Sequence, residues 1–237
     1  MKVIEPRKVE DVVIELFDDY KETLEEFSNN YNKELLEFAE TISKCHRNYQ
    51  LFNNIKNPSD RVIQVGGFVY LSFDNTYTSM KLLMLGYLTP SGNMLRQSLE
   101  SACMAVLLAT DREIEIAGKK GKKQKIKFYE DFVDDKKHTL SHKAVSYVDN
   151  NQEILGVYDK SISSFIKGKQ FYNQYSHPSK MSMASRLTPA NNISWLMGGG
   201  YDIEKKPIYD REVDARVNFA EILPTFVQEV FDRAKQA

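Results

Sequence analysis

A helical stripe near the N-terminus constrains the fold most. Its apolar residues recur at alternating steps of four and three, the spacing that places side chains on one face of an α-helix. The average step matches a straight helix rather than a strict heptad, so we expect packing within a bundle. Asn29, Asn30 and Asn32 are poor helix formers, so the stripe forms one long helix or two with a bend. The stripe comprises Val13, Phe17, Tyr20, Leu24, Phe27, Tyr31, Leu35, Phe38, Ile42, Cys45 and Tyr49.

The rest of the chain also predicts helices. Residues 61–88 contain no proline and carry apolar side chains almost all round, which is typical of a central helix. No alternating strand pattern stands out. We therefore predict an all-α multi-helix bundle that forms a single domain over residues 1–237. Further helices are predicted at 152–175, 179–187, 189–196 and 210–234.

Composition and charge exclude several classes of protein. With 237 residues and 42% hydrophobic content, the chain can bury a sizeable core. Lys and Arg number 32 against 33 Asp and Glu, so no global charge indicates a nucleic acid or an anionic membrane as partner. Two distant cysteines, Cys45 and Cys103, match no disulfide framework and favour the cytoplasm. The longest apolar run, residues 102–109, is too short to span a bilayer.

A lysine-rich segment interrupts the helical pattern at residues 118–127, GKKGKKQKIK. Two glycines and six lysines predict an exposed loop, and the spacing of a P-loop is missing. Such a loop can neutralise phosphates without reading a sequence. The alternative is a solvated linker whose charge is offset by the acidic segment that follows. The candidate binding residues here are Lys119, Lys120, Lys122 and Lys123.

The stretch YNQYSHPS at residues 172–179 predicts a junction between two helices. A residue before proline is disfavoured in the helical region, so His177 should end one helix and Pro178 should start the next. In the simpler interpretation His177 caps a helix end. In the alternative it belongs to a site with three polar neighbours, Asn173, Tyr175 and Ser176.

A second polar pair lies on the predicted third helix. Arg96 and Glu100 are one turn apart beside an apolar stripe, where charged groups need partners. They form either a plain intrahelical ion pair or, with His177, a shared polar site. The segments NMLRQSLESACMAVLLA and FYNQYSHPS together resemble uncharacterised bacterial all-helical proteins of the broad HEPN class, whose members often serve prokaryotic defence and RNA metabolism.

The resemblance departs from the ribonucleolytic HEPN motif. That motif has an Arg followed after four to six residues by a His, and none of the histidines here has such an Arg upstream. Lys137 keeps the spacing to His142, but a lysine replaces the forked guanidinium by a point charge. We therefore expect a protein that is not a nuclease by this motif.

A possible metal site is the runner-up. Asp134, His138 and His142 recur every four residues, so a helix would stack them on one face, where they could hold zinc or iron. The internal Glu of a zinc hydrolase motif is missing, and the alternative is a solvated helix face. Because no dinucleotide fingerprint or paired Cys motif appears either, we expect no cofactor.

These observations lead to two functional hypotheses. The first is a cytoplasmic, HEPN-like helical protein that binds a protein or RNA partner in defence or regulation, with no membrane contact. The second is an enzyme in which His177 acts as acid or base beside Arg96 and Glu100. We also expect a homodimer, because the first two helices present more apolar surface than a simple hairpin covers. Tyr20, Phe27 and Tyr31 would lie in its interface.

Overall fold

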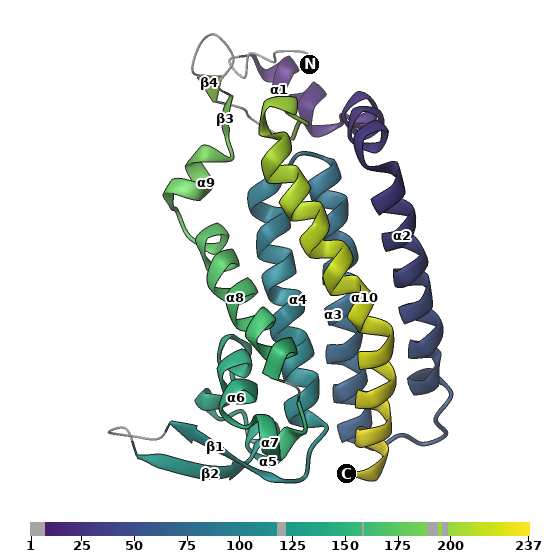
Figure 1. Ribbon diagram of the computed structural model, residues 1–237, viewed down its shortest axis with the longest axis vertical. Coiled ribbons are helices and arrows are strands. Elements are labelled where there is room, and N and C mark those ends of the chain that lie inside the picture. Colours follow the sequence, from purple (N-terminus) through teal and green to yellow (C-terminus); the bar gives the residue numbers. More distant parts are fainter. Residues whose placement is uncertain (1–7, 118–121, 158, 189–193, 196–198) are drawn as a thin grey trace.

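The computed structural model is an all-α bundle, as the sequence predicted (Figure 1). It describes residues 8–117, 122–157, 159–188, 194–195 and 199–237. Long helices α2, α3, α4 and α10 run along the bundle, and α8 lies beside α4. The elements are α1 (Val9–Leu16), α2 (Lys21–Asn53), α3 (Asp60–Met84), α4 (Leu88–Leu108), β1 (Glu113–Ala117), β2 (Lys123–Lys127), α5 (Phe128–Val133), η2 (Lys137–Thr139), η3 (Ser141–Lys143), α6 (Ala144–Asn150), α7 (Gln152–Leu155), α8 (Asp159–Ser176), α9 (Lys180–Ala184), β3 (Leu187–Thr188), β4 (Ser194–Trp195), η4 (Ile203–Lys205) and α10 (Lys206–Gln236).

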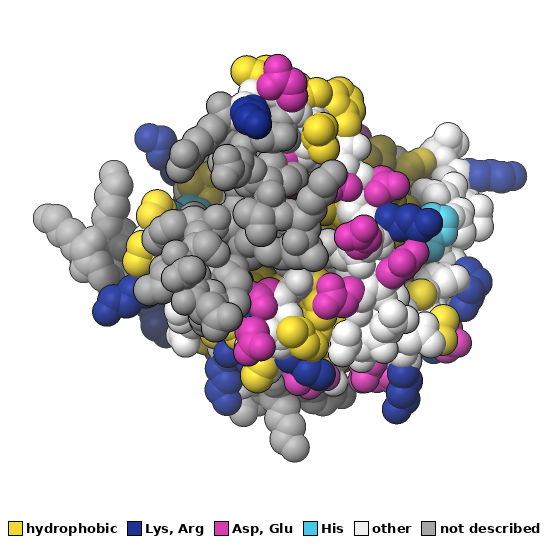
Figure 2. Space-filling model, turned by 90° about the horizontal axis from the view of Figure 1, so that it is seen from above, with side chains coloured by type: hydrophobic (Ala, Val, Ile, Leu, Met, Phe, Trp, Pro, Cys, Tyr) yellow, Lys and Arg dark blue, Asp and Glu magenta, His cyan; other side chains and the backbone are white. Residues whose placement is uncertain are grey.

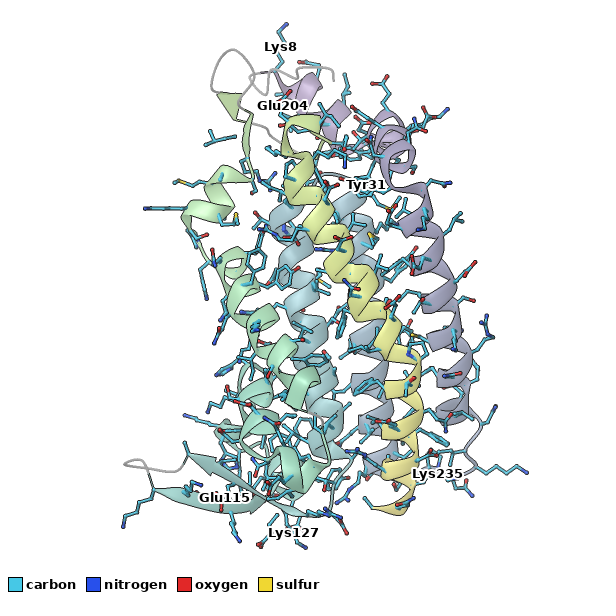
Figure 3. The ribbon with its side chains drawn as sticks, viewed as in Figure 1. Lys8, Tyr31, Glu115, Lys127, Glu204 and Lys235 are labelled. Carbon is cyan, nitrogen blue, oxygen red and sulfur yellow. The ribbon has the colours of Figure 1, made fainter. Side chains whose placement is uncertain are left out.

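The N-terminal stripe forms two helices and a bend. The left-handed Tyr20 (φ 51°) separates α1 from α2, and non-helical Tyr31 (φ −132°) kinks α2 where the asparagines cluster. Within α2 the stripe is core, because Phe27 and Tyr31 pack on α10 and the Tyr31 hydroxyl donates to Asp210 Oδ1 at 2.8 Å. Figure 3 labels Tyr31 in the half of the bundle where Lys8 lies. At α1 the stripe is not core, since Val13 within the helix is 45% exposed and Phe17 just after it is 84% exposed.

The prediction that no strands form was wrong. Residues 113–117 and 123–127 pair as an antiparallel hairpin, with Ile114 opposite Ile126. The three isoleucines 114, 116 and 126 are buried in an apolar cluster that includes residues of α4 and α6, and this burial stabilises the pairing despite the many lysines. Of the predicted exposed loop at 118–127, residues 118–121 lie outside the described part of the chain, and the second half is strand β2. Figure 3 labels Glu115 and Lys127 on this hairpin, at the far end of the bundle from Lys8.

Close helix packing positions α8 on α4. A methyl group added at Gly92 of α4 would lie 2.8 Å from Cγ of Tyr175, and one added at Gly168 of α8 would lie 3.0 Å from Leu99 Cδ1. Glycine at both positions therefore lets the helices approach closely. A neighbouring contact brings together the two segments that carried the sequence resemblance, since Arg96 of the first donates a hydrogen bond to Asn173 of the second.

No helix in the described part of the chain is both long and apolar enough to cross a membrane.

Candidate functional site

The polar centre of the bundle is a buried pair on α10 that the sequence analysis missed. Arg216 is fully buried, and its Nη1 lies 2.9 Å from Oε2 of Glu212, one turn earlier. Its Nε donates to Ser79 Oγ at 2.9 Å and its Nη2 to Ser91 Oγ at 2.6 Å. The guanidinium therefore ties α10 to α3 and α4 through charge-assisted hydrogen bonds.

Two tyrosines of the YNQYSHPS stretch complete this network. The Tyr172 hydroxyl donates to Glu212 Oε2 at 3.1 Å, and the Tyr175 hydroxyl donates to Oε1 at 3.2 Å. Burial raises the pKa of both hydroxyls far above the usual range, so they stay protonated donors at neutral pH. Because the partners of both charges are protein groups already in place, we interpret the network as structural.

Arg96 and Glu100 form the contrasting pair. Arg96 Nε lies 3.7 Å from Glu100 Oε1, which is an ion pair without a hydrogen bond, and both atoms are buried with no hydrogen-bond partner in the described structure. Arg96 Nη1 instead donates to Asn173 Oδ1 of α8 at 3.3 Å. The structure thus brings together three of the predicted site residues, Arg96, Glu100 and Asn173.

The remaining residues of the predicted site are dispersed. The helix junction at His177 is confirmed, but the next helix begins at Lys180 with Ser179 as its N-cap, two residues later than predicted. His177 is exposed, and no contact joins it to Arg96 or Glu100 among the described residues. Ser176 Oγ donates to the Tyr172 carbonyl within α8 at 3.3 Å.

The runner-up metal site does not form as predicted. Helix α5 ends at Val133, and Asp135 adopts a left-handed conformation (φ 52°), so Asp134, His138 and His142 share no helix face. His138 Nε2 lies 2.7 Å from Asp131 Oδ2 instead. Within the described ranges, no group of three His, Cys, Asp or Glu side chains could hold a metal ion.

The lysine segment is partly compensated by acidic neighbours. Lys119 and Lys120 lie outside the described residues, and Lys122 is exposed. Lys123 Nζ pairs with Glu115 Oε2 across the hairpin at 2.7 Å. At the opposite end of the bundle, Figure 2 shows Asp and Glu side chains gathered on the surface.

An apolar groove lies between α8 and α10, with α4 as its floor. Figure 1 shows α4 behind these two helices. Two adjoining cavities form the groove: one of about 400 Å³ at Leu99 and Tyr172, and one of about 380 Å³ at Cys103 and Val230. Both are lined by Phe165 and Ile222, so the two cavities adjoin at these side chains.

The groove has a charged rim. Glu221 and Glu229 line the lower cavity from α10, are exposed, and take part in no ion pair or hydrogen bond within the described structure. Ile222 is 43% exposed between them. On the floor, burial raises the pKa of the Cys103 thiol well above its usual range, so this cysteine is an apolar packing residue rather than a nucleophile.

Comparisons of the chain with protein-family models, with curated proteins and with solved structures found no match.

Proposed function

We propose that the chain is a binding protein, and that the groove between α8 and α10 holds a basic amphipathic helix of a protein partner. The observation that carries this proposal is the pair of adjoining apolar cavities, of about 400 and 380 Å³, which the described residues leave open. An amphipathic helix laid into an apolar groove is a recurring mode of recognition, in which side chains one turn apart fill successive pockets.

The spacing of the cavities favours a helix. On α10 the upper cavity is lined from Ala215 to Ile222 and the lower one from Glu221 to Arg233. Their centres are therefore roughly eight residues apart, or about 12 Å at the helical rise. Residues i and i+7 of a partner helix are about 10.5 Å apart on one face, so large apolar side chains at these positions would enter the two cavities.

The rim charges favour a basic partner. Glu221 and Glu229 are separated by two helical turns, or about 12 Å, and neither forms an ion pair in the described structure, although Arg233 lines the same cavity. Lysine or arginine residues beside the apolar stripe of a partner helix would face these carboxylates. Complementary charge of this kind increases the association rate and fixes the register of the complex.

Membership of the HEPN-like class, and with it a role in prokaryotic defence or regulation, is part of the same proposal. It is supported by the contact between the two resembling segments, since Arg96 of one donates a hydrogen bond to Asn173 of the other. The homodimer stays a prediction, and the expected interface residues Phe27 and Tyr31 are covered by α10 of the same chain.

The other two hypotheses have less support. For RNA, the described lysines of the hairpin are partly neutralised, Lys123 by Glu115 and Lys127 by Glu130. For an enzyme, His177 is exposed, while Arg96 is engaged by Glu100 and Asn173. A protein partner would occupy the open groove, which neither RNA binding nor catalysis by His177 requires.

A designed peptide tests the proposal. The probe is a fluorescent, hydrocarbon-stapled 18-residue helix with leucines at i, i+3, i+4 and i+7 and lysines beside them, titrated with the full chain by anisotropy. We expect saturable binding, and at least about tenfold weaker binding of the same peptide with glutamate for lysine. Equal binding of the two peptides, or binding of neither, would contradict the proposal.

Matched variants locate the peptide. Ile222→Asp places a charge between the two cavities and should weaken binding by about tenfold or more. Ile63→Asp is the control, because Ile63 is similarly exposed on α3 and lines neither cavity. If both variants bind the lysine peptide as tightly as the parent, the groove is not the binding surface.

A further inference from the structure

We propose a second site, for a small phosphate-bearing anion, in a polar cavity at the end of α10. The cavity has a volume of about 420 Å³ and lies between the turn after α4, the end of α7 and the last turn of α10. Two guanidinium groups line it, those of Arg112 and Arg233, which are far apart in the sequence.

Backbone carbonyls hold both guanidiniums in place. Arg112 Nη1 donates to the Ile154 carbonyl at 2.9 Å, while Arg233 Nη1 and Nη2 donate to the carbonyls of Leu155 and Gly156 at 2.5 and 3.3 Å. Gly156 permits this convergence, because its left-handed backbone (φ 58°) ends α7. Of five donors on each arginine, four on Arg112 and three on Arg233 stay available for a ligand.

Neither arginine is held in an ion pair. No ion pair joins Arg112 or Arg233 to a carboxylate within the described ranges, although Asp111 also lines the cavity and offsets part of their charge. The preference for an anion therefore rests on the unused guanidinium donors, which bind oxyanions through charge-assisted hydrogen bonds.

The available donors favour a phosphate over a carboxylate. Guanidinium forks match phosphate oxygens in pairs, and a phosphate offers more acceptor oxygens than a carboxylate. Thr110 Oγ1 accepts a hydrogen bond from the Arg112 backbone N–H at 3.2 Å, so its hydroxyl proton remains available to a further oxygen. Thr110 also lines the cavity, whose volume lies in the range of small-ligand sites and suits a phosphate ester such as a nucleoside monophosphate.

The site adjoins the groove, because Arg233 and Gly156 line both this cavity and the lower cavity of the groove. The residues that would bind the anion are in place without a bound helix, so the anion site can be tested without a partner helix.

Calorimetric titration of the full chain with AMP, with inorganic phosphate and with acetate tests the site. We expect AMP and phosphate to bind and acetate to bind at least about tenfold more weakly. Arg112→Gln should weaken AMP binding by about tenfold, since it removes a charge and a donor fork. Arg47→Gln is the control, because Arg47 is exposed on α2 and bonds only to Ser43 in the described structure.

A second variant distinguishes a loss of AMP binding from a loss of folding. Arg233→Lys retains the charge and loses the fork, and its thermal unfolding is followed in parallel. Weaker AMP binding by a variant that melts like the parent supports the site. Absence of AMP and phosphate binding at millimolar concentration, equal binding of acetate, or unchanged affinity in Arg112→Gln would each overturn it.

Discussion

The two sides of α10 differ in what covers them. Toward α2 and α3, residues such as Val213 and Ala220 are buried in one apolar cluster with Phe27 and Tyr31 of α2. Toward α8, Ile222 remains 43% exposed above a floor formed by α4, with unpaired glutamates beside it. The side of α10 that packs toward α2 and α3 therefore stabilises the fold, and the side toward α8 remains available for a partner.

Substitution on the covered side should have the largest effect. Phe27 is fully buried between α2 and α10, so Phe27→Asp buries a charge and empties a large apolar site. We expect a loss of more than about 4 kcal/mol in the free energy of unfolding, measured by urea denaturation. Phe17→Asp is the control and should change it little, because Phe17 is 84% exposed. A folded, stable Phe27→Asp monomer would show that this side is an interface between copies.

The buried pair beneath α8 should give the next largest effect. Glu212→Gln keeps the shape of the side chain but leaves Arg216 as an uncompensated buried charge, since the guanidinium is fully buried. Removing one partner of such a pair costs about 3 to 5 kcal/mol, which urea denaturation resolves. A variant as stable as the parent would mean that the hydrogen bonds that Arg216 donates to Ser79 and Ser91 are enough to hold the arginine.

The matched change at the second pair should have a smaller effect. Glu100 is as buried as Glu212, but its Oε1 accepts no hydrogen bond in the described structure and Arg96 is partly exposed. Glu100→Gln should therefore change the free energy of unfolding by less than about 1 kcal/mol. A loss as large as that of Glu212→Gln would show that the two pairs are equivalent.

Substitution in the groove should affect stability least. Ile222 is exposed and makes contacts only along the open cavities, so Ile222→Asp should shift the free energy of unfolding by about 0.5 kcal/mol or less. Thermal and urea unfolding check this value before any binding experiment. A loss above 2 kcal/mol would indicate that the groove is covered in the isolated chain.

The sequence predicted the architecture because helical periodicity is a local property. It missed the hairpin because only Ile114, Ile116 and Ile126 alternate with charged residues there, and the lysines obscured that signal. For the buried network a signal was present. Tyr209, Val213, Arg216, Ala220 and Leu223 follow one another at steps of four and three, so the arginine lies within the apolar stripe.

The candidate site could be predicted only in part. Arg96–Glu100 and Glu212–Arg216 have the same composition and spacing, and what separates them is where Tyr172 and Tyr175 of α8 pack. That packing depends on contacts distant in sequence. No sequence pattern marks the groove, because it forms where no described element covers α4 between α8 and α10.

Hydrogen exchange with and without the leucine–lysine helix tests the central claim most directly. A bound helix would shield the walls of the groove, so protection should rise in residues 162–172 of α8 and 215–233 of α10. Residues 21–53 of α2 should be unchanged, and Ile222→Asp should abolish the added protection. Unchanged exchange in α8 and α10, or protection that rises in α2 instead, would contradict the claim.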